Sequence, residues 1–420
     1  MAEDKGLTQS ILVVGGGISG LTTAVEAAEA GRDVFIVEKR PYLGGRVAQL
    51  NQYFPKLCPP TCGLEINFRR IRQNPRIKIL TMAEVEKISG EEGNFDVSIK
   101  LNPRYVNENC TACGACGEVV TTEIPNEYNY NMDKIKAAYL PHDMAYPMRY
   151  VIAPEIIGTD EATKAKEACK YDAVDLDMKP ESVSLKVASI VWATGWNPYD
   201  ATKMENLGFG KVPNVITNVM MERLAAFDGP TQGKIVRPAD GKPVESVAFV
   251  QCAGSRDENY MAFCSHICCL ASLKQTTYIR EQLPDAKVTI FYIDIRALGK
   301  YEDFYTTVAA DDNVTLIKGK VAKVEADPAG DKILVEAEDI YSGSKSQAKV
   351  DLVVLATGME PSTATEKLPT DVAYDESGFV MSEKPGVYAA GCTKKPLDVA
   401  TTNRDATAAA LKAIQSTVRR

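Results

Sequence analysis

The chain has 420 residues, 45% of them hydrophobic, which is enough for two or three domains with packed cores. Its formal net charge of −8 argues against nucleic acid as a partner. Only two histidines occur, so we do not expect histidine-rich metal chemistry, whereas 11 cysteines gather in clusters. Clustered cysteines favour bound metal or redox thiols in a reducing cytoplasm over structural disulfides.

The first predicted elements form a dinucleotide-binding βαβ unit. Residues 11–14 predict a buried parallel strand, residues 21–30 an alanine-rich helix and residues 33–37 a second strand. A G-x-G-x-x-G loop joins the first strand to the helix, and an acidic residue ends the second strand about 20 residues further on. The cofactor residues assigned here are Gly15, Gly17, Ser19, Gly20 and Glu38.

Each glycine of this loop has a physical role. Gly15 permits the tight turn, Gly17 lets the backbone approach a pyrophosphate, and Gly20 lets the helix pack on the strand. The helix N-terminus attracts the phosphates, and Glu38 accepts hydrogen bonds from the ribose hydroxyls. The apolar stretch 11–28 approaches the length of a membrane span, but its glycines favour a buried strand and helix. No other run is long enough, so we expect no direct membrane span.

The residues that follow favour FAD over a nicotinamide cofactor at the same loop. The stretch 39–46 resembles the Glu-Lys…Gly-Gly-Arg segment of flavoprotein disulfide reductases and amine oxidases, and its cofactor residues would be Lys39, Gly45 and Arg46. Two predicted strands, 189–195 and 351–358, end in Ala-Thr-Gly, a recurrent feature of that superfamily. The first supplies the further cofactor residues Ala193, Thr194 and Gly195.

A late segment brings a helix to the flavin in this superfamily. Residues 386–391 precede the alanine-rich stretch 405–413, and Gly391 is assigned to the cofactor. The usual Gly-Asp pair is Gly391-Cys392 here, so the ordinary ribityl contact is not expected. Cys392 would then simply pack near the flavin.

A cysteine pair, Cys58 and Cys62, follows the Gly-Gly-Arg stretch. Three interpretations remain open: a redox pair near the isoalloxazine, auxiliary cluster ligands, or structural thiols.

Residues 104–178 predict a ferredoxin-like insert in which one of two cluster sites survives. Cys110, Cys113 and Cys116 follow C-x2-C-x2-C, and in two-cluster ferredoxins the fourth cysteine of each run ligates the other run's cluster. Cys169 has the spacing of the fourth position of a second run, so these four would complete one [4Fe–4S] site. The other site has lost its ligands, which are replaced by Val120, Thr159, Ala162 and Ala165. The alternatives are a zinc site and unrelated buried thiols.

A second dinucleotide domain is predicted between the two Ala-Thr-Gly strands, but its phosphate loop is absent. The strand 246–250 runs into Gln-Cys-Ala-Gly-Ser-Arg where a glycine-rich loop belongs, and a further strand follows at 287–293. We therefore expect no tight NAD(P)H binding. Four thiols occupy the vacated place, which indicates a second, irregular iron–sulfur site or a buried helix face with unrelated thiols. They are Cys252, Cys264, Cys268 and Cys269.

The predicted fold class is α/β, a two-domain flavoprotein of the thioredoxin reductase type with a half-degenerate ferredoxin-like insert. The FAD domain would comprise residues 1–103, 179–240 and 351–420, the insert residues 104–178, and the degenerate NAD(P)-type domain residues 241–350. No catalytic residue is assigned.

Taken together, the fingerprint, the interrupted insert and the C-x3-C-C element resemble the A-subunit family of heterodisulfide reductases over nearly the whole chain. The resemblance implies a [4Fe–4S] cluster near the flavin, ligated by Cys252, Cys264, Cys268 and Cys269. The short form resembles most the branch represented by the A-subunit of the quinone-interacting membrane-bound oxidoreductase of sulfate reducers.

That branch implies a cytoplasmic subunit, held at the membrane by its partners, that links a quinone module to adenylylsulfate reductase in sulfate respiration. The implied partners are a homologous flavin subunit and a haem-bearing membrane subunit. Two alternatives remain: a stand-alone flavin thiol–disulfide reductase, and a heterodisulfide-reductase-type subunit with another partner.

Overall fold

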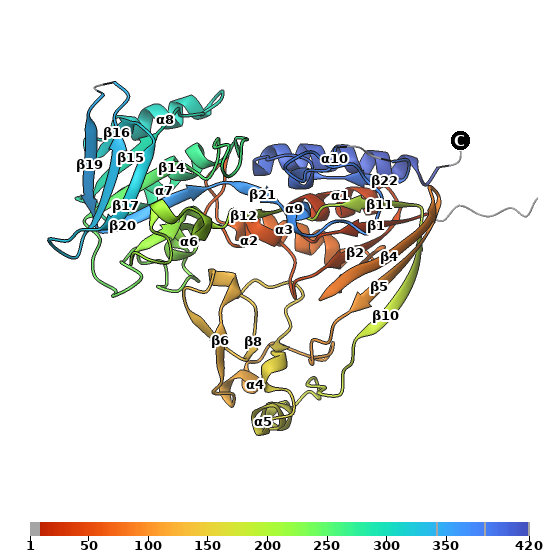
Figure 1. The fold of residues 1–420 in the computed structure, drawn as a ribbon. Coiled ribbons are helices and arrows are strands. Elements are labelled where there is room, and N and C mark those ends of the chain that lie inside the picture. Colours follow the sequence, from red (N-terminus) through yellow and green to blue (C-terminus); the bar gives the residue numbers. More distant parts are fainter. Residues whose placement is uncertain (1–8, 342, 382–383, 419–420) are drawn as a thin grey trace, which may run out of the picture. The chain divides into compact units, whose positions relative to one another are not determined.

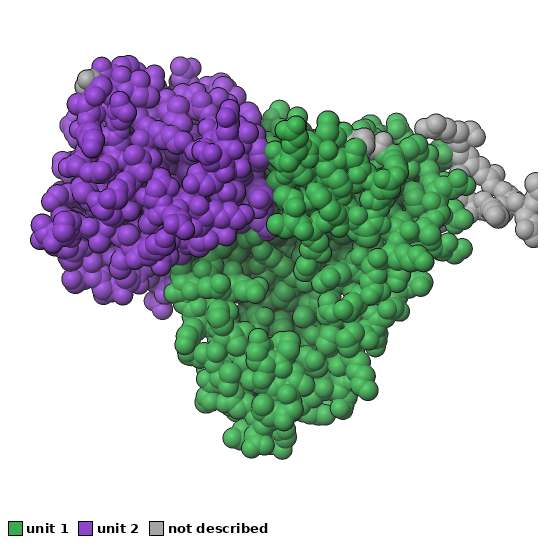
Figure 2. Space-filling model, viewed as in Figure 1, with its two compact units in different colours: residues 1–196, 361–420 green, residues 197–360 purple. Residues whose placement is uncertain are grey.

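The computed structural model describes residues 9–341, 343–381 and 384–418, and the chain divides into two compact units (Figure 1, Figure 2). Unit 1 comprises residues 1–196 and 361–420, and unit 2 residues 197–360. The chain passes between them through two short strands, β12 (Trp196–Pro198) and β21 (Met359–Pro361).

Unit 1 is built on a parallel five-stranded sheet in the order β22-β11-β1-β2-β3. The strands are β22 (Val387–Ala389), β11 (Ser189–Trp192), β1 (Ser10–Val14), β2 (Asp33–Glu38) and β3 (Ile77–Thr81). Helices cover one face, and an antiparallel sheet in the order β10-β5-β4 packs on the other (Figure 1). The helices of this unit outside the insert are α1 (Ile18–Glu29), α2 (Gly45–Ala48), α3 (Pro60–Gln73), α9 (Ser362–Thr365) and α10 (Val399–Gln415). The antiparallel strands are β4 (Ala83–Glu91), β5 (Asn94–Leu101) and β10 (Glu181–Val187).

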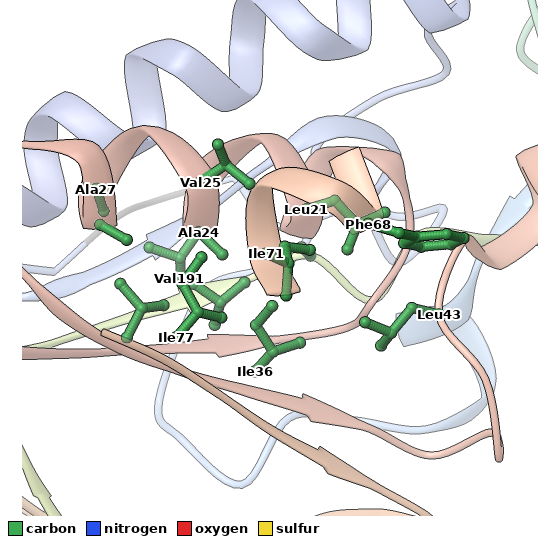
Figure 3. Packing of buried hydrophobic residues seen from close by; sticks show 14 of the residues in the cluster. Leu21, Ala24, Val25, Ala27, Ile36, Leu43, Phe68, Ile71, Ile77 and Val191 are labelled. Atoms are coloured by element: carbon green, nitrogen blue, oxygen red, sulfur yellow. The ribbon is translucent and has the colours of Figure 1, made fainter. Parts of the chain in front are cut away.

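The core of unit 1 follows from the two-residue period of β1. Ile11 and Val13 pack under the helices, whereas Leu12 and Val14 pack against the antiparallel sheet. Figure 3 shows the helix side of this core, where Leu21 and Ala24 of α1 meet apolar side chains from α3 and the central strands. Both faces of the sheet are thus buried, as expected of a parallel sheet.

The insert leaves this framework after β5 and returns at β10, so it joins two neighbouring strands of the antiparallel sheet. It contains two helices, α4 (Ala115–Glu118) and α5 (Asp160–Ala168), and four short strands. The strands are β6 (Glu123–Pro125), β7 (Lys134–Lys136), β8 (Ala138–Tyr139) and β9 (Val151–Ile152).

Unit 2 repeats the plan of unit 1. Its parallel sheet has the order β13-β20-β14-β15-β16, an antiparallel sheet in the order β17-β18-β19 accompanies it, and three helices complete the unit. The parallel strands are β13 (Val215–Thr217), β20 (Leu352–Thr357), β14 (Ser246–Ala253), β15 (Lys287–Tyr292) and β16 (Val314–Lys318). The remaining elements are β17 (Val321–Ala326), β18 (Ile333–Glu338), β19 (Lys345–Val350), α6 (Asn218–Ala225), α7 (Cys268–Gln282) and α8 (Tyr301–Ala309).

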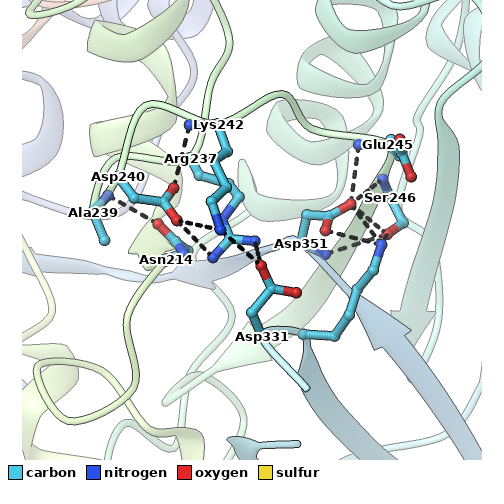
Figure 4. Close-up of polar contacts among 10 residues, drawn as sticks. Asn214, Arg237, Ala239, Asp240, Lys242, Glu245, Ser246, Asp331 and Asp351 are labelled. Carbon is cyan, nitrogen blue, oxygen red and sulfur yellow. Dashed lines mark hydrogen bonds and ion pairs between the residues drawn. The ribbon is translucent and has the colours of Figure 1, made fainter.

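At the start of the unit 2 sheet, the carboxylate of Asp351 joins β14 to β20 (Figure 4). It accepts hydrogen bonds from the backbone N–H groups of Glu245 and Ser246, both at 3.0 Å, and pairs with Lys332 at 2.9 Å. Burial by itself would raise the pKa of Asp351, but the bonds from Lys332 and Ser246 outweigh it and lower the pKa.

The predicted fold class is confirmed, while the predicted limits of the second domain need correction. Residues 197–240 and 351–360 belong to unit 2, although the sequence placed them in the FAD domain. The reason is strand pairing: β20, which ends in the second Ala-Thr-Gly, lies in register between β13 and β14 and completes the unit 2 sheet.

Replacing Gly20 by alanine should destabilise unit 1, because a Cβ there would lie 1.8 Å from the backbone oxygen of Gly15. Overpacking of this kind costs about 1–3 kcal/mol. Urea unfolding followed by circular dichroism measures the change. The control is Gly330→Ala, where no heavy atom lies within 4 Å and the change should stay within about 0.5 kcal/mol. Equal stabilities for the two variants would contradict the packing argument.

Candidate functional site

The loop between β1 and α1 forms a cradle held by close backbone contacts. Gly15, at φ 111°, donates its N–H to the Val37 oxygen at 2.7 Å. A Cβ on Gly15 would lie 2.2 Å from the Ala193 oxygen, so only glycine fits. At Gly17 the nearest atom to a Cβ would be the Gly45 Cα at 3.8 Å, which leaves open space beside the backbone. The N-terminus of α1 faces the same loop, and a helix N-terminus attracts phosphate groups.

Glu38 closes the cradle at the end of β2. Its buried carboxylate accepts hydrogen bonds from the N–H groups of Gly16 at 2.6 Å and Arg40 at 2.8 Å. Burial raises the pKa of Glu38, while these two bonds oppose the shift. A carboxylate has about four lone-pair sites, so two accepted bonds leave capacity for ribose hydroxyls.

The Gly-Gly-Arg segment lies directly against this loop. Gly44 donates its N–H to the Gly16 oxygen at 2.8 Å, and a Cβ on Gly45 would lie 2.8 Å from the Gly17 Cα. The Arg46 guanidinium donates to the Trp196 oxygen at 3.3 Å, and burial lowers its pKa. Lys39, by contrast, forms an exposed ion pair with Glu366 at 3.1 Å, a contact that adds little stability.

The first Ala-Thr-Gly and the Gly391 turn meet at the same edge of the sheet. The Thr393 hydroxyl accepts the Gly195 N–H at 3.1 Å and lies 3.2 Å from the Thr194 hydroxyl. Gly391, at φ 65°, approaches Ser19: a Cβ there would lie 2.9 Å from the Ser19 Cβ. Apart from Lys39, whose side chain pairs with Glu366 in solvent, the predicted cofactor residues of unit 1 therefore converge on one edge.

A carboxylate that sequence reasoning missed supports the Gly391 turn. Asp405 of α10 accepts the Gly391 N–H at 2.7 Å and pairs with Lys394 at 3.0 Å. The neighbouring Cys392 is buried, and burial raises the pKa of its thiol to about 11. Cys392 therefore carries a neutral thiol at the position where the superfamily has an aspartate.

The insert brings its four predicted ligands together. Cys116 lies in α4 and Cys169 follows α5, and these two helices pack together. Burial raises the pKa of Cys116 to about 11, with further contributions from the neighbouring thiols of Cys110, Cys169 and Cys113. Two of the sulfurs accept backbone N–H groups, Cys110 from Ala112 at 3.4 Å and Cys169 from Ala173 at 3.3 Å.

The vacated half of the insert is filled with apolar side chains. Val120, Ala162 and Ala165 are each 0% exposed and belong to one hydrophobic cluster with Cys116. Thr159 caps α5 instead, because its hydroxyl accepts the Ala162 N–H at 3.5 Å. These four residues thus stabilise the insert by packing and capping.

A buried arginine that the sequence did not single out anchors the insert. The Arg104 guanidinium donates to the backbone oxygens of Pro41 at 2.7 Å, Arg149 at 2.5 Å and Tyr150 at 2.9 Å. Burial, with a smaller effect of Arg149, lowers its pKa to about 10. A side chain added at Gly114 or Gly117 would meet the Tyr150 ring or hydroxyl. Arg104 thus connects Pro41, in the loop after Glu38, to the segment of Tyr150. The Tyr150 side chain in turn lies beside Gly114 and Gly117, next to the cysteines.

In unit 2 the other four thiols gather where β14 passes into α7. Cys252 has φ 55° at a register shift in the pairing of β14 with β20, which indicates a β-bulge. Cys268 and Cys269 begin α7, and Cys264 lies in the connecting loop. Burial raises the pKa of Cys252 to about 11 and that of Cys268 further, and neighbouring thiols add to both shifts. The residues that line the small cavity between them are Cys252, Ser255, Arg256, Cys264, His266, Cys268, Cys269, Asp294 and Arg296.

Cationic side chains accompany these thiols. Arg256 hydrogen-bonds to Cys252 and forms an ion pair with Asp294, and its pKa is raised because these contacts outweigh burial. The backbone of Arg296 hydrogen-bonds to Cys269, which lowers the pKa of that thiol against the larger effect of burial. Positive charge and N–H donors would stabilise thiolates bound to a cluster.

Among the residues that the structure describes, no group of three or more His, Cys, Asp and Glu side chains is arranged to hold a metal ion. Each four-thiol group nevertheless consists of the soft donors that iron–sulfur clusters require.

The remaining cysteine pair flanks the start of α3. Cys58 is partly buried and Cys62 is exposed, and both thiols raise the pKa of Tyr53, although burial is the larger cause. A Cβ on Gly63 would lie 2.3 Å from the Tyr53 hydroxyl, so this tyrosine presses on the first turn of the helix.

No helix in the described part of the chain is long and apolar enough to cross a membrane.

Comparison with known proteins finds relatives that match nearly the whole chain. A family model described as an NAD(P)-binding Rossmann-like domain matches residues 13–77. The chain is 38% identical to the second iron-sulfur A-subunit of the CoB–CoM heterodisulfide reductase of Methanopyrus kandleri, over 97% of this chain and 64% of the relative. It is 36% identical to the A-subunit of the H(2):CoB-CoM heterodisulfide,ferredoxin reductase of Methanothermobacter thermautotrophicus, over 98% and 64%. The chain is thus similar to heterodisulfide reductase A-subunits over nearly its whole length. It spans less than two thirds of the length of these relatives.

Solved structures agree with the fold. The thioredoxin reductase of Lactococcus lactis matches with a TM-score of 0.55 at 13% identity, over 98% of this chain and 99% of that one. The thioredoxin reductase of T. acidophilum matches with a TM-score of 0.53 at 16% identity, over 98% and 100%. The chain therefore has the two-domain thioredoxin reductase fold.

Replacing Arg104 by lysine should loosen the insert, because an ammonium cannot reach three carbonyl oxygens in the fork geometry of a guanidinium. Leaving buried carbonyls unpaired costs about 2–4 kcal/mol in local opening free energy. Hydrogen exchange of residues 104–178, followed by mass spectrometry, measures this change in opening free energy. The control is Arg76→Lys, whose exposed ion pair with Asp33 should leave exchange unchanged. Unchanged exchange in Arg104→Lys would show that the anchor is unimportant.

Proposed function

We propose that this chain is an FAD- and iron–sulfur-containing electron-transfer subunit of a multisubunit oxidoreductase. The observation that carries the proposal is the position of Cys252, Cys264, Cys268 and Cys269. In a dinucleotide-binding unit the turn between the first strand and its helix receives the phosphates. In unit 2 that place, between β14 and α7, holds four thiols, whereas unit 1 keeps its glycine cradle.

FAD would be held by the edge of unit 1 described above. The open space at Gly17 would receive the pyrophosphate, Glu38 would accept hydrogen bonds from the ribose hydroxyls, and the Gly391 turn would lie near the flavin. FAD supplies exchange of electrons singly or in pairs. The protein would bind and orient it, and the partly buried Arg46 adds positive charge beside the Gly44-Gly45 loop.

Two four-cysteine sites would hold one [4Fe–4S] cluster each. In the insert the ligands are Cys110, Cys113, Cys116 and Cys169, and in unit 2 they are Cys252, Cys264, Cys268 and Cys269. N–H donors to the sulfurs and the cations Arg256 and Arg296 stabilise the thiolate form. The clusters supply one-electron steps.

The wider assembly is proposed from resemblance. The curated relatives are named as subunits of heterodisulfide reductases, and the Methanothermobacter protein's name includes ferredoxin. We propose that this chain, too, works with partner subunits, including a homologous flavin subunit and a haem-bearing membrane subunit, at the cytoplasmic side of a membrane. In that assembly it links a quinone module to adenylylsulfate reductase. A heterodisulfide-reductase-type complex with another partner is the competing assembly, and identification of co-purifying subunits separates the two.

A second candidate is a stand-alone flavin thiol–disulfide reductase. The observation in its favour is the pair Cys58 and Cys62 beside Tyr53, with Cys62 exposed. Such an enzyme needs no iron and takes its electrons from NAD(P)H. Anaerobic mixing with NADH or NADPH separates the two functions, since rapid bleaching of the flavin in iron-free protein supports the reductase alone.

Replacing Gly17 by valine should remove FAD while unit 1 still folds. The first added atom meets only the Gly45 Cα at 3.8 Å, but the side chain occupies the space proposed for the pyrophosphate. Flavin absorbance per chain should fall to near zero, and far-UV circular dichroism should be unchanged. Wild-type flavin content in folded Gly17→Val would refute the assigned cradle.

Iron analysis and EPR of anaerobically purified protein test the two clusters. Wild type should hold about eight irons by the four-iron composition of each cluster. Cys169→Ala and Cys268→Ala should each lose one EPR signal and about one to four irons. Ala165→Ser, in the apolar half of the insert, should keep the wild-type count. About four irons in wild type with no loss in Cys268→Ala would reduce the unit 2 site to buried thiols.

A further inference from the structure

The insert carries most of the chain's net charge. Residues 104–178 contain 13 Asp and Glu against seven Lys and Arg, a net charge of −6, whereas the whole chain carries −8. Within the described part of the chain, no Asp, Glu, Lys or Arg of this segment forms an ion pair. One of its seven cations, Arg104, is buried and bound to backbone oxygens. The negative charge of the insert is therefore left largely uncompensated by the chain itself.

The four-cysteine site of the insert lies within this negatively charged segment and is partly exposed to solvent. Cys113 is exposed and Cys110 and Cys169 are only partly buried, in contrast to unit 2, where Cys252, Cys268 and Cys269 are all buried. An electron carrier at an exposed site exchanges electrons readily with a partner, because the transfer rate falls steeply with the distance between the two centres. The insert site is thus the one suited to intermolecular transfer.

Exposed apolar side chains flank the same cysteines. Val119, three residues after Cys116, is 38% exposed, and Tyr171, two residues after Cys169, is 50% exposed. Met148, which is 52% exposed, lies two residues before Tyr150, the ring beside Gly114 and Gly117. Large apolar side chains near a charged rim are typical of protein interaction sites.

We propose that these residues form an electron-exit face that docks a one-electron redox protein with a basic surface around its redox centre. The face consists of Cys113, Val119, Met148 and Tyr171, with Glu118 and Asp172 at its rim, and it rests on the proposed cluster in the insert. The negative field attracts and orients the basic partner, and the apolar residues make the short-range contact. Encounters of this kind bury less than about 1,200 Å² and dissociate quickly, as turnover requires.

Two lysines beside the face allow the effect of charge on electron transfer to be tested in both directions. Lys166 and Lys170 flank Cys169 in the sequence, and both are exposed. Charge reversal at Glu118 therefore weakens the field, whereas charge reversal at Lys170 strengthens it. Both side chains are exposed, so neither change disturbs the core.

The experiment follows electron transfer from the anaerobically reduced holoprotein to cytochrome c, a basic one-electron acceptor, by stopped flow at 20 and 300 mM salt. The second-order rate constant should fall about tenfold or more between these salt concentrations, since screening removes steering. At low salt Glu118→Lys should slow the transfer by about twofold to fivefold, and Lys170→Glu should speed it by a similar factor. Tyr171→Ser should slow transfer at both salt concentrations.

Two controls isolate the face. Glu91→Lys makes the same charge change at the end of β4, opposite the start of β5 and about 24 Å by strand rise from the end of β5 that leads into the insert, and should leave the rate unchanged. With ferricyanide, a small anion, Glu118→Lys should speed the transfer instead, which a structural defect would not do.

The outcomes separate this inference from the function on which it rests. Iron content and EPR are recorded first for every preparation. Absence of the insert cluster in wild type overturns the proposed function. The proposed face alone is overturned if the cluster is intact but the rate of electron transfer to cytochrome c does not change with salt, with Glu118→Lys or with Lys170→Glu.

Discussion

The carboxyl edge of a parallel sheet is the constraint on which both candidate sites depend. Parallel strands joined by crossover helices end on the same edge, so the loops that follow them must meet there. In unit 1 this edge brings together the Gly15 loop after β1, Glu38 at the end of β2, the Ala-Thr-Gly after β11 and the Gly391 turn after β22. In unit 2 the corresponding edge carries Cys252 at the end of β14, and the cavity there is also lined by Asp294, just beyond β15. One architectural rule thus positions a dinucleotide cradle in one unit and a thiol site in the other.

The two units carry different loops on the same scaffold. In unit 1 the turn between β1 and α1 is short and leaves no room for side chains. A Cβ on Gly20, for example, would lie 1.8 Å from the Gly15 oxygen. In unit 2 the segment between β14 and α7 is long, and its side chains pack against Gly358: a Cβ there would lie 2.3 Å from the Ser255 hydroxyl. The long loop carries Cys264 and allows α7 to begin with two cysteines. Where unit 1 has glycines that leave the backbone accessible, unit 2 has thiols, which are soft donors.

The insert has an apolar core at the positions where a second four-ligand site of a ferredoxin-like segment would lie. Burial of Val120, Ala162 and Ala165 supplies hydrophobic packing in place of four ligand bonds. Arg104 holds the segment to the loop after Glu38, so the surviving cysteines are fixed relative to the cradle of the same unit. Asymmetry within the insert leaves its thiols nearer to solvent than those of unit 2, a difference that bears on which site exchanges electrons with other proteins.

The sequence by itself determined the features that depend on local pattern: the βαβ fingerprint of Gly15, Gly17 and Gly20, the two cysteine groups, and the split ferredoxin spacing that links Cys169 to Cys116. These are fixed by residue type and separation, and the fold class followed from them. Only the tertiary structure decided that β20 belongs to unit 2 and that Lys39 pairs with Glu366. It also decided that Arg104 anchors the insert and that Asp405 supports the Gly391 turn. Strand partners, buried hydrogen bonds and ion pairs join residues far apart in the chain, and no local spacing encodes them, because the compact fold alone brings those groups within bonding distance.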